Sequence, residues 1–206
     1  MYGTAFRLYF SLMYGSGMHE ETVFLNITQA LEYLHPQIFR DRSRYCSTEQ
    51  WRKFLQWFRE NFPQDIAPHS GVAQRFANRD NFVGLLVSRV GSLNNFSLQS
   101  KLEDLLEGVP ENTLYPICDN PRDIAVYRAQ LIKKTVRTRN YLTHFNEEEK
   151  RRAASGEELR KMCGQLWAVL TYWLGKEFIS DEKILDNISI ESSEKAQFVI
   201  RFKAKV

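Results

Sequence analysis

The sequence has few cysteines and lacks the short motifs of several large enzyme classes. Cys46, Cys118 and Cys163 are odd in number and far apart, and no CxxC or His/Cys cluster accompanies them. This pattern indicates neither a disulfide framework nor a zinc site, and it favours the reduced thiols of a cytoplasmic protein. The sequence also lacks a Gly-rich phosphate loop and paired catalytic carboxylates, which argues against kinases, nucleotidyltransferases and glycosidases. We therefore predict no metal site and no cofactor.

Long apolar runs are missing as well. Segments 5–14 and 163–174 are apolar, but both are much shorter than a membrane span, and Arg7 and Gln165 interrupt them. No basic leader precedes the first segment, so it does not have the pattern of a signal peptide. We expect no membrane association. Internal repeats and low-complexity tracts are absent too.

The composition is that of an ordinary globular chain. With 206 residues, 43% of them hydrophobic and 26% charged, the chain can form one domain, or one domain with an appendage. The net charge of +3 is modest. Electrostatic attraction to a polyanion therefore requires that the positive charge be concentrated in one region.

Segment 120–146 concentrates positive charge on a predicted helix. Asn120 can cap this helix, and Pro121 suits its first position, where the missing N–H costs nothing. Residues at spacings of three and four predict a buried side: Ile124, Tyr127, Leu131, Thr135, Thr138 and Leu142. Five cations occur with no acidic residue among them: Arg128, Lys133, Lys134, Arg137 and Arg139. We expect the helix to end near Asn146, which three glutamates follow at 147–149.

The six residues from Arg139 to His144 include the types needed to cleave RNA without a metal. Histidine can take the proton of a 2′-hydroxyl, and a guanidinium can stabilise the charge that develops on the phosphate. Asn140 is four residues before His144, so its amide can orient the imidazole. Arg139 and His144 are about 140° apart around an ideal helix. Either the helix unwinds near its end, or two chains combine their residues across a dimer axis.

The same residues also have a purely structural explanation. With 17 Arg and 4 His in the chain, the Arg-x4-His spacing occurs by chance about 0.3 times. Basic residues near a helix C-terminus also complement the helix dipole. Glu32 either holds Arg139 or His144 in place as a supporting residue, or is a solvated flank residue. We expect His35 to be a packing or surface histidine.

An Arg-Asn-x-x-x-His element at the end of a long helix, followed by a long apolar helix, resembles the HEPN superfamily of ribonucleases. Segment 24–32, FLNITQALE, is similar to the opening helix of the HEPN domain at the C-terminus of ApeA-like anti-phage defence proteins. The resemblance covers about residues 20–180. It implies an all-α fold, an antiparallel bundle of about five to seven helices, with a short extended C-terminal tail.

The resemblance also implies roles for individual residues. His144 would be the general base toward the 2′-hydroxyl, Arg139 would stabilise the phosphate and Asn140 would position them, giving a 2′,3′-cyclic phosphate. We assign Lys133, Lys134 and Arg137 to substrate binding, and Tyr141 with Glu32 to supporting roles. The implied protein is a homodimer that cleaves RNA, with tRNA as a candidate target. It would act in antiviral defence as a toxin that arrests growth, the mode called abortive infection.

An alternative of a different class stays open. A helical dimer without catalytic activity could bind RNA or a partner protein as a scaffold or regulator. The complete set of Arg139, Asn140 and His144 counts against this alternative, because a decayed site does not need all three.

The expected organisation has three parts. Residues 1–18 form an N-terminal appendage or linker. In the HEPN family that the chain resembles, the corresponding region would connect the helical domain to an N-terminal sensor domain. A regulatory protein is the alternative partner. Residues 19–188 form the helical domain, and residues 189–206 form a tail in which 197–203 alternates like a strand.

Within the domain, capping signals and breakers predict helices over 19–40, from Ser47 to before Pro63, and over 72–90, 97–107 and 155–174. Ser47 with Gln50 and Ser155 with Glu158 are predicted capping boxes. The last of these helices is apolar nearly all round, so we expect it to be central or to lie in a subunit interface. The helix after Ser47 has an aromatic face, which we expect to lie in the core; stacking on bases is the less common role. Its members are Trp51, Phe54, Leu55 and Phe58.

Overall fold

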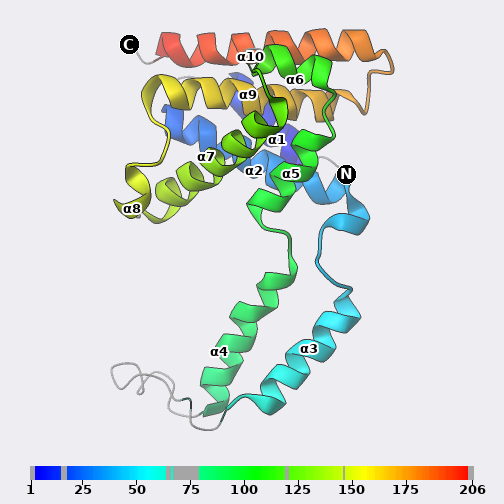
Figure 1. The fold of residues 1–206 in the computed structure, drawn as a ribbon, viewed down its shortest axis with the longest axis vertical. Helices are drawn as coiled ribbons and strands as arrows, with labels where there is room; N and C mark the ends of the chain where they lie inside the picture. The colour runs from blue at the N-terminus through cyan, green and yellow to red at the C-terminus, as the bar shows by residue number, and fades with distance from the viewer. Residues whose placement is uncertain are drawn as a thin grey trace. The chain divides into compact units, whose positions relative to one another are not determined.

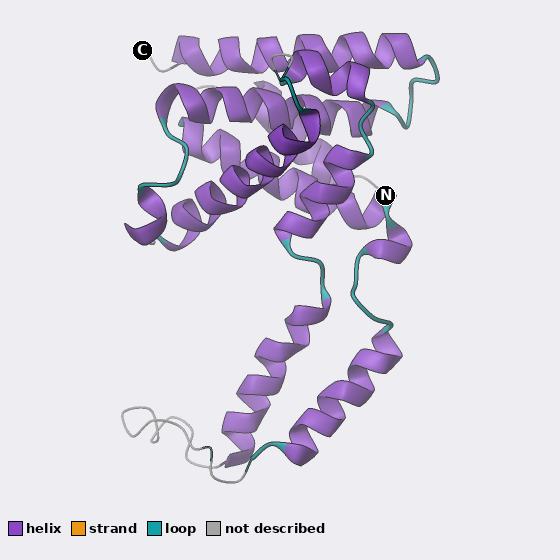
Figure 2. Cartoon of the chain, viewed as in Figure 1, coloured by secondary structure: helices purple, strands orange, loops and turns teal. Residues whose placement is uncertain are grey.

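The computed structural model describes residues 3–14, 18–63, 66, 79–118, 121–145 and 147–203. Every regular element in these ranges is helical (Figure 2), which confirms the predicted all-α class. They contain ten α-helices, more than the five to seven expected. In these ranges, β-type pairing is limited to one isolated antiparallel bridge between Arg44 and Asn95. None of the described helices is long and apolar enough to cross a membrane.

The chain divides into two compact units. The larger unit comprises residues 1–40 and 97–206, and the smaller unit comprises residues 41–96. The boundaries predicted at 18 and 188 do not coincide with these units. Helix α1 (Gly3–Tyr14) packs on α2 (Glu20–Ile38), and α10 (Glu182–Lys203) continues past residue 188 without a break.

Helix α9 (Gly156–Gly175) is the centre of the larger unit. It buries every residue from Met162 to Leu174 and packs against α2, α6 and α10. This confirms the first of the two positions expected for this helix, the centre of the bundle. Ser155 is at the N-cap as predicted, but its side chain accepts no capping hydrogen bond, so the predicted capping box with Glu158 does not form.

Helix α10 lies beside α9 (Figure 1), and it corrects the prediction of an extended tail. Residues 197–203 are helical, so the predicted strand is wrong. Leu185, Ser189 and Ser192 recur at helical spacing and are buried. Each serine hydroxyl donates to a carbonyl of its own helix, at 2.8 Å for Ser189 and 2.7 Å for Ser192. The small, internally bonded side chains therefore let the helix approach the bundle closely.

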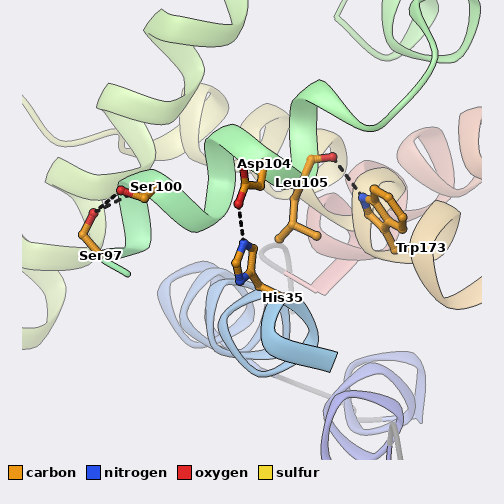
Figure 3. Close-up of polar contacts among 6 residues, drawn as sticks. All are labelled: His35, Ser97, Ser100, Asp104, Leu105 and Trp173. Carbon is orange, nitrogen blue, oxygen red and sulfur yellow. Dashed lines mark hydrogen bonds and ion pairs between the residues drawn. The ribbon is translucent and has the colours of Figure 1, made fainter. Parts of the chain in front are cut away.

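Helix α5 (Leu98–Glu107) begins where the capping signal predicts it. The Ser97 hydroxyl accepts a hydrogen bond from the Ser100 backbone N–H at 3.1 Å, and Figure 3 shows the pair. At the other end, Trp173 donates its indole N–H to the Leu105 carbonyl at 2.9 Å. A Cβ on Gly108 would lie 2.6 Å from the Trp173 ring. Gly108 therefore ends the helix where α9 approaches it too closely for any side chain.

A buried polar pair joins α2 to α5. His35 Nε2 lies 2.8 Å from Asp104 Oδ2, with His35 0% and Asp104 7% exposed (Figure 3). The His35 ring also lies 5.0 Å from the ring of Phe39. Of the two roles expected for His35, packing or surface, the structure shows packing.

Helix α6 (Glu111–Ile117) was not predicted from the sequence. Pro110 occupies its N-cap and Pro116 lies inside it, so the local sequence resembles a stop signal. The helix is held by contacts to α10: Asp186 accepts hydrogen bonds from the Asn112 amide at 2.7 Å and from the Thr113 hydroxyl. Its formation therefore depends on tertiary contacts.

The smaller unit contains α3 (Thr48–Asn61) and α4 (Arg79–Gly91), which lie side by side in Figure 1. The predicted capping box is confirmed: Gln50 N–H donates to Ser47 Oγ at 3.2 Å, and Ser47 N–H donates to Gln50 Oε1 at 3.1 Å. Residues 72–78 of the predicted third helix lie outside the described residues. The prediction that the aromatic face of α3 lies in the core is wrong, because every residue of this helix is at least partly exposed.

Candidate active site at the end of α7

Helix α7 (Ile124–His144) begins later than predicted. Asp123 is its N-cap, and Asp123 Oδ1 accepts a hydrogen bond from Val126 N–H at 3.0 Å. Pro121 therefore precedes the helix, and Asn120 lies outside the described residues. The aspartate displaces the predicted start because its carboxylate satisfies an N–H of the first turn.

The helix stays regular to its last residue, His144. Phe145 then takes a left-handed conformation with φ 51° and ψ 39°, and its N–H donates to the Tyr141 carbonyl at 2.7 Å. The end predicted near Asn146 is correct to within two residues, although Asn146 itself is not described. Unwinding before His144, one of the two geometries left open by the sequence, does not occur.

The buried side of α7 fixes the helix in the bundle. Thr138 is fully buried, and its hydroxyl donates to the Lys134 carbonyl at 2.8 Å. The same oxygen accepts a hydrogen bond from Ala154 N–H at 2.9 Å, which ties the segment before α9 to α7. One turn earlier, the buried Thr135 hydroxyl lies 3.5 Å from Met162 Sδ. The two threonines therefore belong to the buried stripe, as predicted.

Arg139 and His144 face different surroundings. Arg139 is half-buried, and its Nη2 lies 3.8 Å from Glu32 Oε2 on α2. His144 is exposed, and Asn140 is half-buried. Within the described ranges, neither the Asn140 amide nor the His144 ring forms a hydrogen bond or ion pair. A regular helix turns 100° per residue, so the two side chains leave α7 about 140° apart. One protomer therefore does not aim both groups at a single phosphate.

Tyr141, assigned to a supporting role, is half-buried and packs on the helix cap. Its ring lies 6.4 Å from the ring of Phe145, at 75°. Phe145 is 74% exposed. The end of α7 therefore presents an imidazole beside an aromatic surface.

Carboxylates from other helices meet most of the cations that the sequence places on α7. These carboxylates belong to α2, α8 (Glu147–Lys150) and α9. The pairs are Arg139 with Glu32 at 3.8 Å, Arg137 with Glu149 at 3.9 Å, and Lys134 with Glu158 at 2.9 Å. Sequence reasoning missed two of these acids, because Glu149 was interpreted as part of the helix stop and Glu158 as part of a capping box.

Lys133 lies apart from the other predicted substrate-binding residues, in a groove of about 580 Å³ between α5 and α7. Glu103 and Glu107 line the α5 side of this groove. On the α7 side, Arg128 donates a hydrogen bond to the Val109 carbonyl at 3.5 Å. The predicted cationic side is therefore divided between two faces of the helix.

Burial and ion pairing raise the pKa of two further groups in the larger unit. Cys163 is fully buried, and burial raises the pKa of its thiol well above the ordinary value of 9.0. Lys150 pairs with Glu147 at 3.2 Å, and that hydrogen bond raises the pKa of Lys150. In the part of the chain that the structure describes, no group of three or more His, Cys, Asp and Glu side chains could hold a metal ion.

Comparison with protein families identifies a match that covers most of the chain. The family model described as Apea-like HEPN matches residues 25–184, which is well over half of the chain and includes every candidate residue at the end of α7. Searches of curated proteins and of solved structures give no match.

Proposed function

Because the chain belongs to the Apea-like HEPN family, we propose that it is a metal-independent endoribonuclease that uses Arg139, Asn140 and His144. HEPN domains are commonly ribonucleases. The observation that carries the proposal is the position of His144. Its imidazole is exposed at the end of a regular helix that ends in the Arg-Asn-x-x-x-His element, so an RNA backbone can reach it.

The proposed reaction is transfer of a phosphodiester to the neighbouring 2′-hydroxyl. The His144 imidazole takes the 2′-hydroxyl proton, and the 2′-oxygen forms a bond to phosphorus. The bond from phosphorus to the 5′-oxygen of the next nucleotide breaks, and that oxygen takes up a proton. The products are a 2′,3′-cyclic phosphate and a 5′-hydroxyl. The Arg139 guanidinium stabilises the added negative charge through paired N–H donors.

The geometry of α7 favours a site shared by two subunits. Arg139 and His144 diverge on one regular helix, so a second copy related by a two-fold axis can supply the missing group. HEPN proteins often form dimers. In such a dimer, Arg139 of one copy and His144 of the other would act on the same linkage, twice per dimer.

The neighbouring residues have roles in the same proposal. Glu32 orients Arg139 across the 3.8 Å gap between their charged groups. Lys134 and Arg137 bind flanking phosphates by exchanging their carboxylate partners for the RNA backbone, and Lys133 contacts RNA from the α5 side. We further propose that the protein acts in the cytoplasm, where cleavage of tRNA arrests growth in anti-phage defence. A sensor domain or a regulatory protein controls this activity.

One observation favours the alternative of a scaffold that does not cleave RNA. Three of the cations on α7 already have carboxylate partners, which reduces their attraction for phosphate. A helical dimer of this kind would bind RNA or a partner protein without breaking a bond.

A cleavage assay separates these two functions. Total RNA is incubated in EDTA with the wild-type protein, His144→Ala, Arg139→Ala and the control His19→Ala, which removes another exposed histidine. We expect cleavage by the wild type and His19→Ala, loss in the other two variants, and a cyclic phosphate at the new 3′ end of a defined oligonucleotide. Equal cleavage by His144→Ala would refute the ribonuclease proposal, and RNA binding without cleavage by all four proteins would establish the scaffold.

A further inference from the structure

Two different helices pack beside the two reactive groups of α7. Arg139 lies 3.8 Å from Glu32 on α2, and Arg137 lies 3.9 Å from Glu149 on α8. Arg137 and His144 are seven residues apart, which places them about 20° apart around a regular helix and about 10.5 Å apart along its axis. Arg139 is about 160° from Arg137. His144 is therefore on the α8 side of α7, and Arg139 is on the α2 side.

The turn that follows α8 is fixed against the α8 side of α7. The backbone N–H groups of Arg152 and Ala153 both donate to the Glu149 carbonyl, at 2.9 Å and 2.8 Å. Ala154 N–H then donates to the buried hydroxyl of Thr138 on α7 at 2.9 Å. Both ends of the turn are thus tied to α7, less than two helical turns before that helix ends. Figure 1 shows α8 beside this end of α7.

This turn carries two arginines that have no carboxylate partner. Arg151 and Arg152 are exposed, and within the described ranges neither guanidinium forms an ion pair or a hydrogen bond. A cation that is already paired must give up its carboxylate to bind a phosphate, so a free guanidinium gains more from the same contact. Four neighbouring cations are paired in this way, at distances of 2.9 to 3.9 Å: Lys134, Arg137, Arg139 and Lys150.

We propose that Arg151 and Arg152 bind phosphates of the RNA strand whose neighbouring linkage lies at His144. A strand that presents one phosphodiester to the imidazole brings its next phosphates along the same side of α7, where the two adjacent arginines lie. Because the turn is already held by hydrogen bonds, binding does not have to order its backbone. The choice of RNA rests on the proposed function, but binding at this turn does not require that the protein cleave RNA.

Binding of a labelled RNA tests this inference in the full chain. Fluorescence anisotropy follows a 12-nucleotide single strand in a His144→Ala background, which prevents the proposed cleavage. Arg151→Gln with Arg152→Gln is expected to weaken binding about 5- to 30-fold, the loss of two exposed charge contacts. The control, Arg122→Gln with Lys183→Gln, removes the same charge from other exposed positions. Arg122 directly precedes the N-cap of α7, at the opposite end from the site, so the control should lose less than about twofold.

Two further measurements distinguish a phosphate contact from a general effect of charge. For a single strand, the slope of log K against log salt falls by about 0.7 in magnitude for each phosphate that the protein no longer neutralises. The slope should therefore fall by about 1.4 in the double arginine variant and stay unchanged in the control. In the background that retains His144, KM for cleavage of the same RNA should rise by a factor similar to the loss of affinity. Circular dichroism establishes that each variant folds.

Three outcomes separate this inference from the ribonuclease proposal. If the double arginine variant loses binding while the wild type cleaves nothing, the phosphate contact stands and the ribonuclease proposal fails. If the wild type cleaves RNA but the double variant binds as tightly as the control, the inference is refuted and the ribonuclease proposal stands. If the double variant changes the oligomeric state and leaves RNA affinity unchanged, the turn is a protein contact and the inference is wrong.

Discussion

The buried pair of His35 and Asp104 allows a quantitative prediction about the bundle. Replacing either residue with Leu leaves the other polar group buried without the partner 2.8 Å away. We expect each single change to lower the free energy of unfolding by about 3 kcal/mol. For a chain of this size, that loss lowers Tm by about 6–12 °C.

The double variant His35→Leu/Asp104→Leu shows whether the two residues act as a pair. It should be more stable than either single variant, because apolar groups of similar volume can replace a buried polar pair at little cost. Urea unfolding, followed by circular dichroism and by the fluorescence of Trp167 and Trp173 in the same unit, measures the four proteins. Additivity of the two single changes within about 0.5 kcal/mol would refute the coupling.

Three further predictions concern the candidate site and its support. Glu32→Gln should change the free energy of unfolding by less than about 1 kcal/mol, because its pair with Arg139 is partly exposed. It should lower kcat for RNA cleavage about 10-fold, because Arg139 is no longer oriented, and unchanged kinetics would exclude the supporting role. Thr138→Val should lower the free energy of unfolding by about 1–3 kcal/mol, because the buried Ala154 N–H loses its acceptor; wild-type thermal stability would contradict this. Since burial raises the pKa of Cys163, its thiol releases a proton on unfolding above pH 9, so the free energy of unfolding should fall as the pH rises there. Urea titrations should give a shallower fall for Cys163→Ala, and equal slopes of stability against pH in the two proteins would contradict this.

Local signals in the sequence predicted several helix boundaries. The capping box of Ser47 and Gln50 marks the start of α3, and Ser97 marks the start of α5. The apolar sequence over 162–174, interrupted by Gln165, predicted a helix that is central or lies in an interface, and α9 is central. These features depend on neighbouring residues within one turn or one face, which a single sequence displays directly.

The errors concern contacts between distant segments. The alternation over 197–203 resembles a strand, but the segment continues a helix whose earlier turns are buried against α9. Helix α6 forms despite its two prolines, because Asp186 on α10 accepts hydrogen bonds from it. The aromatic periodicity of α3 predicted a buried face, but every residue of α3 is at least partly exposed. A sequence does not show how much neighbouring surface is available to cover a helix face.

The candidate site was predicted in part. The exposed His144 at the helix end follows from the sequence, and so does the divergence of Arg139 from it. The partners of the cations do not follow from the sequence, because Glu149 and Glu158 reach α7 only through the packing of α8 and α9. Charge counted along one helix therefore overestimated how much positive charge is left for a ligand.

Mixing two inactive variants tests the shared site most directly. Arg139→Ala and His144→Ala are each expected to be inactive alone. If each site combines Arg139 of one subunit with His144 of the other, half of the dimers in an equilibrated 1:1 mixture contain one intact site of two. The mixture should then recover about one quarter of wild-type cleavage in EDTA. No recovery from a mixture shown to exchange subunits, with both variants folded, would contradict a site built from two copies of α7.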